Sequence, residues 1–411
     1  MKFQLKNNDF LWNALGIGIN SFNSLFFMIL VTRINGLGIA GIFSYAFALG
    51  CLFYYCSTYY TRPYQIANFE KFDFNSFLST RVVTSIISLI TIFLFGVISG
   101  FTNYKIAIIV LIFLFKILES ISDCFYGFIH KKEKLYYVGK SMFFKSLLGI
   151  LFFFLVDYFS HSLILSILAL IFINLIVLVF FDLKEYYKWG GNNFKFNIIN
   201  VKRILFQTFS IFIFSFFANF LYNLQKYILT YFVSDELQTI FGILIMPATI
   251  MILAGSCLIN PFINKFNDYK TCKDFKSFNR LLRNIMLVLI MIGVFALLCC
   301  NYLGIPILNF IYSVSLADNK FLLLLAVTGS FFTAMVNILS GCLTILDRNK
   351  EQLIIYAIVS IISVFLSVIL IKLYSISGAI YAFFISMVII FLVYFVFYMF
   401  TMKKNCYNSD N

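Results

Sequence analysis

Long apolar runs recur along the whole chain, and short polar segments separate them. Each run has about 18 residues or more, which is enough for a helix to cross roughly 30 Å of hydrocarbon. A transmembrane barrel would instead show segments of about ten residues with alternating hydrophobicity. The pattern predicts an all-α polytopic membrane protein with about 12 transmembrane helices. The predicted spans are 10–32, 37–60, 82–101, 106–129, 143–160, 162–181, 205–232, 239–261, 284–303, 320–346, 353–373 and 376–400.

The polar segment at 182–203 divides these spans into two sets of six. Because six is an even number, both sets enter the membrane in the same direction, as in transporters built from parallel repeats. An offset of 198 residues places Pro63 opposite Pro261, which is a weak trace of such a repeat. We therefore expect two six-helix lobes. The predicted boundaries are 1–184 for the N-lobe, 185–203 for a cytoplasmic linker and 204–411 for the C-lobe.

Composition and charge support this architecture and set the orientation. Hydrophobic residues make up 62% and charged residues 12% of the 411, whereas soluble domains carry about 25% charged residues. Of the 31 Lys and Arg, 25 lie in segments on the side of the N-terminus. This is the positive-inside pattern, so we expect both ends in the cytoplasm. The net charge of +14 then reflects topology, and we expect no nucleic-acid partner.

The residues that metals and catalysis would need are scattered. The nine cysteines include no Cys-x-x-Cys pair, and His130 and His161 are far apart in the sequence. We expect no metal, no cofactor and no catalytic residue. An enzyme that transfers lipid-linked sugars needs an acid or base on the outer face, and the outer connections are short with few acids. A membrane glycan polymerase is therefore a disfavoured alternative.

Three ionisable residues occupy the fourth span: Lys116, Glu119 and Asp123. A charge at the centre of the bilayer costs about 2.5–3.5 kcal/mol even on insertion scales. At 100° per residue these three share one helix face with Ser120 and Gly127. One interpretation is a cavity wall, in which Lys116 meets an anion and Glu119 or Asp123 binds a coupling cation. The alternative is that Lys116 and Glu119 merely form an ion pair with each other at i and i+3. Asp123 would then have no ion-pair partner in this span.

Two other polar positions admit two interpretations each. Lys226 lies about 10 Å from the outer end of span seven at helical rise, so it either binds substrate or extends its amine to the interface. Asn20 belongs to a small and amide face of span one, which is more typical of helix packing than of ligand binding. Arg62 lies at the predicted cytoplasmic surface, and the positive-inside rule explains its position.

The segment "VTRINGLGIAGIFSYAFALG" is similar to one in the Wzx-type flippases and polysaccharide-biosynthesis membrane proteins. These belong to the multidrug/oligosaccharidyl-lipid/polysaccharide (MOP) exporter superfamily. The exit of span eight, with Pro261, resembles the family as well. In span seven the family often has an acidic residue before a basic one, and here Gln225-Lys226 keeps only the base. The matching residues of the first segment are Thr32, Arg33, Gly36, Gly41, Phe43 and Ser44.

The resemblance implies alternating access, with a central cavity that opens first to the cytoplasm and then outward. The implied cargo is an undecaprenyl-diphosphate-linked oligosaccharide for a surface polysaccharide such as the O-antigen of lipopolysaccharide. Lys116, Lys226 and Arg33 would supply the cations for its diphosphate, and Asn20 would also line the cavity. Membrane lipids, a polysaccharide polymerase and glycosyltransferases are the implied partners, and the bacterial inner membrane is the implied location. A cation-coupled multidrug or small-molecule exporter of the same fold is the alternative.

Overall fold

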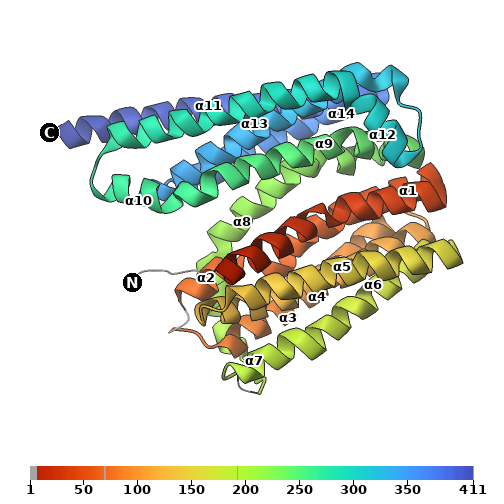
Figure 1. Ribbon diagram of the computed structural model, residues 1–411, viewed down its shortest axis with the longest axis horizontal. Helices are drawn as coiled ribbons and strands as arrows, with labels where there is room; N and C mark the ends of the chain where they lie inside the picture. The colour runs from red at the N-terminus through yellow and green to blue at the C-terminus, as the bar shows by residue number, and fades with distance from the viewer. Residues whose placement is uncertain (1–6, 69–70, 192, 411) are drawn as a thin grey trace. The chain divides into compact units, whose positions relative to one another are not determined.

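The computed structural model describes residues 7–68, 71–191 and 193–410, with the backbone alone at 7–10 and 405–410. Within these ranges the chain is helical apart from short connections, and it contains no strand. The all-α class predicted from the sequence is therefore confirmed. In chain order (Figure 1) the elements are α1 (Asn7–Thr58), α2 (Thr61–Ala67), α3 (Phe74–Ile98), α4 (Asn103–Lys131), α5 (Leu135–Ser160), α6 (Leu163–Val177), η1 (Leu178–Leu183), α7 (Lys184–Lys188), α8 (Ile198–Leu229), α9 (Asp235–Ile259), η2 (Asn260–Phe262), α10 (Ile263–Thr271), α11 (Phe275–Cys299), η3 (Cys300–Gly304), α12 (Ile305–Tyr312), η4 (Ala317–Asn319), α13 (Lys320–Ile345) and α14 (Asn349–Asp410).

Nine helical segments among the described residues are long and apolar enough to cross a membrane. Two of them each cover two predicted spans, because the chain breaks inside them. α1 breaks at Gly36 (φ 84°) and α14 at Ser375 (φ 53°). Both breaks fall at predicted outer connections, and only a positive φ at one residue interrupts each helix. α4 is not among the nine because three charged residues interrupt its apolar run.

The helices form two compact units, residues 1–216 and 217–411. The division falls inside α8, later in the chain than the linker expected at 185–203. The first turns of α8 belong to the N-terminal unit because Asn200 Nδ2 donates to Ser76 Oγ of α3 at 2.9 Å. Farther along α8, Phe212 stacks on Tyr59 with ring centroids 4.2 Å apart.

Side-chain caps define where several helices begin. Asp73 Oδ1 accepts a hydrogen bond from the Ser76 backbone N–H at 3.1 Å at the start of α3. The hydroxyl of Thr102 likewise accepts from the Lys105 N–H at the start of α4, and the Asp274 carboxylate caps α11. Such caps satisfy backbone donors that have no partner within the helix.

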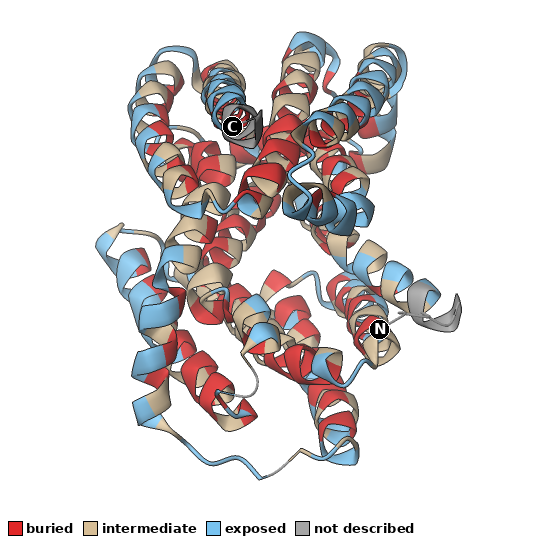
Figure 2. Cartoon of the chain, turned by 90° about the vertical axis from the view of Figure 1, so that its left-hand side faces the viewer, coloured by how far each residue is buried: buried red, intermediate tan, exposed pale blue. Residues whose placement is uncertain are grey.

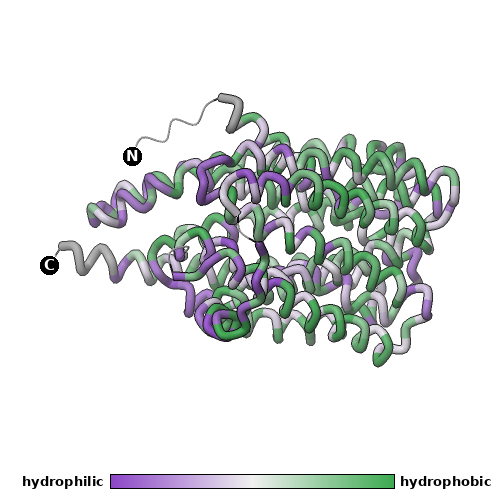
Figure 3. The backbone as a smooth tube through the Cα atoms, turned by 90° about the horizontal axis from the view of Figure 1, so that it is seen from below, coloured by the Kyte–Doolittle hydropathy of each residue, from purple (hydrophilic) through white to green (hydrophobic). Residues whose placement is uncertain are grey.

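Burial and hydropathy agree with helices that cross a membrane. Figure 2 shows buried residues on the helix faces that meet neighbouring helices of the same unit, and exposed residues on the opposite faces. Many of the exposed side chains are large and apolar, such as Ile86 and Phe206, and lipid covers such side chains in a bilayer. Figure 3 shows hydrophobic residues along most of the long helices.

α1 and α5 cross at close range in the N-terminal unit. A Cβ added to Gly16 would lie 2.2 Å from the carbonyl oxygen of Gly139, and a Cβ on Gly139 would lie 2.3 Å from that of Trp12. Small residues at such crossings let membrane helices approach closely. These two glycines fix how α5 packs against α1.

Candidate functional site

The polar stripe of α4 faces the interior of the N-terminal unit. Ser120 is buried and accepts a hydrogen bond from Ser57 Oγ of α1 at 2.8 Å. Ser57 also lies 2.6 Å from Ser85 Oγ of α3. At the cytoplasmic end of the stripe, Gly127 leaves room for Gln65 of α2, whose Oε1 would lie 2.4 Å from an added Cβ. The stripe therefore packs against α1, α2 and α3.

Lys116 and Glu119 form an ion pair, with Lys116 Nζ 2.7 Å from Glu119 Oε2. The amine also lies over two aromatic rings, 4.6 Å from the centroid of Phe47 and 4.9 Å from that of Phe115. The side chains keep 11% and 21% of their exposure, respectively. The i, i+3 pairing that the sequence allowed is thus the arrangement in this structure, and both groups remain partly accessible.

Asp123 is shared between two arginines. Its Oδ1 lies 3.0 Å from Arg62 NH1 of α2, and its Oδ2 lies 2.6 Å from Arg81 NH2 of α3. The Arg81 side chain is fully buried, and its Nε and NH1 have no hydrogen-bond partner among the described residues. One carboxylate therefore faces two guanidinium groups, and this cluster carries an excess positive charge.

The local fold explains how Arg62 comes to this cluster. Tyr59 and Tyr60 adopt left-handed φ values of 47° and 49°, which end α1 and turn the chain into α2. The guanidinium carbon of Arg62 also lies 5.8 Å from the ring centroid of Tyr126 of α4. The positive-inside rule therefore does not fully explain why an arginine is present at position 62, because its side chain also forms an ion pair with Asp123.

A second buried ion pair joins α4, α5 and η1. Lys145 Nζ donates to Asp182, to Ser122 Oγ and, at 3.3 Å, to the hydroxyl of Tyr126. Asp182 also accepts from Ser141 Oγ. The sequence placed Asp182 at the start of a polar cytoplasmic loop, and this was wrong, because the helix continues through a π-helical turn to α7. The pair is neutral overall and its polar atoms are satisfied, so we interpret it as a packing element.

Asn20 makes hydrogen bonds within the α1–α5 contact. Its Oδ1 accepts from Asn23 Nδ2 at 3.2 Å and from Ser146 Oγ at 3.3 Å. Asn23 Nδ2 also donates to Ser146 Oγ at 3.0 Å. Through these contacts Asn20 contributes to the packing of α1 against α5.

The two remaining predicted cations, Arg33 and Lys226, belong to α1 and α8, and Lys226 is part of the C-terminal unit. Arg33 is exposed on α1, three residues before the break at Gly36. Lys226 is half-buried on α8, and its backbone carbonyl accepts from Gln238 Nε2 of α9 at 3.0 Å.

The interior of the C-terminal unit contrasts with that of the N-terminal unit. Its buried polar side chains are all uncharged among the residues that the structure describes. Gln225 is one of them, and its Nε2 donates to Ser367 Oγ of α14 at 3.4 Å. Gln225, which precedes Lys226, is therefore a neutral donor in contact with a hydroxyl. Within the described ranges, no cluster of three His, Cys, Asp or Glu residues could hold a metal ion.

Sequence reasoning missed Arg81, Lys145 and Asp182 as interior residues. All three lie at or near the ends of predicted spans: Arg81 just before one, Lys145 just inside one and Asp182 just after one. Hydropathy places such boundary residues at the membrane surface. Asp123 could have indicated such a residue. An acid at membrane depth that does not pair with Lys116 predicts a basic partner on a neighbouring helix.

The chain is similar to a curated protein in sequence and to solved transporters in structure. No family model matches the chain. A capsular polysaccharide biosynthesis protein, CapF of Staphylococcus aureus, is 25% identical over 366 residues, which cover 86% of this chain and 89% of that protein. An inward-facing multidrug resistance MATE family transporter of the MOP superfamily superposes with a TM-score of 0.72 at 11% identity, covering 97% of this chain and 99% of that one.

Two further solved structures show the same architecture. The lipid II flippase MurJ, in an inward closed conformation, superposes with a TM-score of 0.72 at 14% identity, covering 97% of this chain and 90% of that one. A MOP superfamily transporter from Pyrococcus furiosus gives 0.60 at 12% identity, covering 96% and 94%. The chain has the MOP-superfamily fold. The predicted resemblance is thereby confirmed at the level of the fold. This fold and the nine long apolar segments among the described residues support a multi-pass membrane protein.

Proposed function

We propose that this MOP-fold protein is a flippase for surface polysaccharide biosynthesis. It moves an undecaprenyl-diphosphate-linked oligosaccharide from the cytoplasmic to the outer leaflet of a bacterial inner membrane by alternating access. Two comparisons support the cargo class: the similar CapF protein is named for capsular polysaccharide biosynthesis, and MurJ, which has a similar fold, is named as a lipid II flippase.

The excess positive charge around Asp123 is the observation that carries the proposal. Burying an ionised group costs several kcal/mol unless it is paired and hydrogen-bonded. Arg62 and Arg81 share one carboxylate, and two polar groups of the Arg81 guanidinium have no partner in the described part of the chain. A diphosphate offers several strong acceptors and negative charge. An anionic cargo therefore suits this cluster better than a cationic one does.

The predicted site residues keep their roles as parts of this proposal. Lys116, Lys226 and Arg33 are the further cations for the diphosphate, and Asn20 is an additional polar contact. Glu119 and Asp123 were predicted as ion-coupling residues. Both are ion-paired here, so coupling through either acid requires that its pair opens during the cycle.

The same observation weighs against a multidrug exporter. An exporter of cationic drugs needs an acid that is available to the drug, and the two acids of the α4 stripe are already engaged by cations. The C-terminal unit offers no buried acid among its described residues.

A deletion strain tests the function directly. We expect lipid-linked oligosaccharide to accumulate on the cytoplasmic side, surface glycan to fall and drug susceptibility to stay at the wild-type level. Increased drug susceptibility without accumulation would identify an exporter instead. Single oligosaccharide repeats accumulating on the outer face would identify a polymerase.

A further inference from the structure

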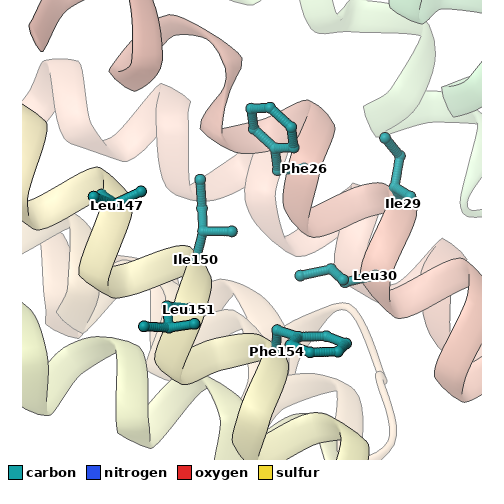
Figure 4. Close-up of a pocket in the computed structure, with 7 residues that line it drawn as sticks. All are labelled: Phe26, Ile29, Leu30, Leu147, Ile150, Leu151 and Phe154. Carbon is teal, nitrogen blue, oxygen red and sulfur yellow. The ribbon is translucent and has the colours of Figure 1, made fainter.

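A groove lies on the surface of the N-terminal unit between α1 and α5. Its cavity volume is about 260 Å³. Three of its lining side chains belong to α1 and four to α5, and Figure 4 shows them on the two neighbouring helices. Several of them are substantially exposed, including Phe26 at 42% and Leu147 at 46%. The lining is entirely apolar and consists of Phe26, Ile29, Leu30, Leu147, Ile150, Leu151 and Phe154.

The groove lies farther along the two helices than their close crossing. At Gly16 and Gly139 the backbones approach too closely to admit a side chain. Toward the outer end of the helices, Phe27 and Phe153 fill the buried side of the contact, with ring centroids 4.9 Å apart. The groove occupies the other side of the contact, in the outer half of predicted span one and the middle of predicted span five. Its lining at this depth of the predicted spans is entirely apolar, which suits a hydrocarbon chain.

The same helix face carries a cation at its cytoplasmic end. At 100° per residue, Lys140, Leu147, Leu151 and Phe154 fall on one side of α5. The Lys140 amine lies 5.2 Å from the ring centroid of Trp12 of α1. No acidic side chain that the structure describes forms an ion pair with this amine.

This amine is held at headgroup level below the groove. The Tyr136 ring centroid lies 5.5 Å from the Lys140 amine, and the Trp12 ring packs edge-on against Phe143 at 5.6 Å. Trp and Tyr are enriched at the membrane interface. Lys140 precedes Leu147 by about 10 Å of helix and Phe154 by about 21 Å, at 1.5 Å per residue. The strip thus presents a cation at the interface and an apolar groove deeper in the bilayer.

We propose that this strip is a docking site for the polyprenyl diphosphate part of the cargo lipid before translocation. The proposal rests on the flippase function proposed above. The diphosphate binds the Lys140 amine at the cytoplasmic interface, and the polyprenyl chain lies in the α1–α5 groove. The charge complements an anionic headgroup, and the spacing suits one molecule with its head at the interface and its tail at mid-bilayer depth. A diphosphate is preferred to a phosphodiester because it brings more negative charge to the ammonium donors.

Photo-crosslinking tests the position of the tail. The full-length protein in phosphatidylcholine nanodiscs carries p-benzoylphenylalanine at position 147 or, as a control, at position 90. Leu147 and Ile90 are both exposed apolar residues, at 46% and 55%. With undecaprenyl diphosphate added, we expect crosslinks to this lipid at 147 and only to phosphatidylcholine at 90. Equal crosslinking of undecaprenyl diphosphate at both positions would overturn the proposal.

Binding measurements with folded variants separate this lipid from ordinary phospholipid. We expect Lys140→Gln to weaken undecaprenyl diphosphate binding about tenfold or more, since a charge-assisted contact is lost. Leu151→Trp should fill the groove and reduce binding similarly. The controls are Lys265→Gln, which removes another lysine lying over an aromatic ring, and Ile90→Trp, and both should leave binding unchanged.

Competition with another anionic lipid tests whether the strip is specific for undecaprenyl diphosphate. Phosphatidylglycerol should not displace undecaprenyl diphosphate at equal concentration. If it does, or if Lys140→Gln weakens both lipids equally, the strip is a general lipid contact and the proposal fails. That failure is distinguishable from failure of the flippase function, because accumulation of lipid-linked oligosaccharide in the deletion strain does not depend on where the tail docks.

Discussion

Replacing Asp123 by asparagine removes the carboxylate that two guanidinium groups share. The substitution preserves the size of the side chain, so the main change is the loss of negative charge beside Arg81, which is fully buried, and Arg62, which keeps 26% exposure. Removing one partner of a buried ion pair typically costs about 3–5 kcal/mol, because the other charge stays buried and uncompensated. Asp123 keeps 13% exposure, so we take the lower end, about 3 kcal/mol.

That cost converts into a shift in apparent melting temperature. Domains of about 150–250 residues lose roughly 2–4 °C per kcal/mol, so Asp123→Asn should lower the melting temperature of the purified protein by about 6–12 °C. Glu351→Gln is the control. Its i, i+3 pair with Arg348 is partly exposed, at 38% and 32%, and such pairs contribute about 0.2–0.5 kcal/mol in isolated helices. We therefore expect a shift of about 2 °C or less for this variant.

A double-mutant cycle completes this test. Arg81→Gln in the Asp123→Asn background should recover part of the lost stability, since no unpaired guanidinium then remains buried at position 81. If Asp123→Asn melts within about 2 °C of the wild type, or if the double variant is as unstable as the sum of the two single variants, the shared-carboxylate account of this cluster is refuted.

Two further predictions concern packing in the N-terminal unit. Gly16→Ala should lower the melting temperature, because its Cβ would meet the Gly139 carbonyl oxygen at 2.2 Å, whereas Gly18→Ala meets nothing within 4 Å and should be neutral. Similar melting of the two variants would contradict the close α1–α5 crossing. Lys145→Met leaves Asp182 buried without its cation and should cost about 3–5 kcal/mol. Adding Asp182→Leu should restore most of that loss, and a double variant no more stable than Lys145→Met would argue against a buried pair.

The sequence predicted the fold well because hydropathy and charge bias act over whole helices. The breaks at Gly36 and Ser375 were expected from short outer connections, and the chain indeed interrupts α1 and α14 there. The start of α8 was not separable from the linker, because polar residues at the cytoplasmic end of a membrane helix have the composition of a loop. Asn200 is an example, since it is polar and yet helical, with its side chain bonded to α3.

The candidate site was only partly predictable for a related reason. The face of α4 that carries Lys116 and Asp123 followed from helical periodicity within one span. The partners Arg62 and Arg81 come from other helices, and a single sequence contains no information on which helices pack together. Arg81 lies next to a predicted span end, where a surface position and an interior position have the same hydropathy signature.

Translocation in proteoliposomes measures the central claim, that a net-positive cluster in the N-terminal unit receives an anionic lipid headgroup. The purified protein is reconstituted with an undecaprenyl-diphosphate-linked oligosaccharide, and the saccharide that reaches the opposite leaflet is counted over time. Arg62 is the partly exposed guanidinium of the cluster, so Arg62→Gln should slow translocation at least tenfold while Lys265→Gln, at the surface of the C-terminal unit, keeps the wild-type rate. Wild-type translocation by Arg62→Gln, Lys116→Gln and their combination would contradict the account.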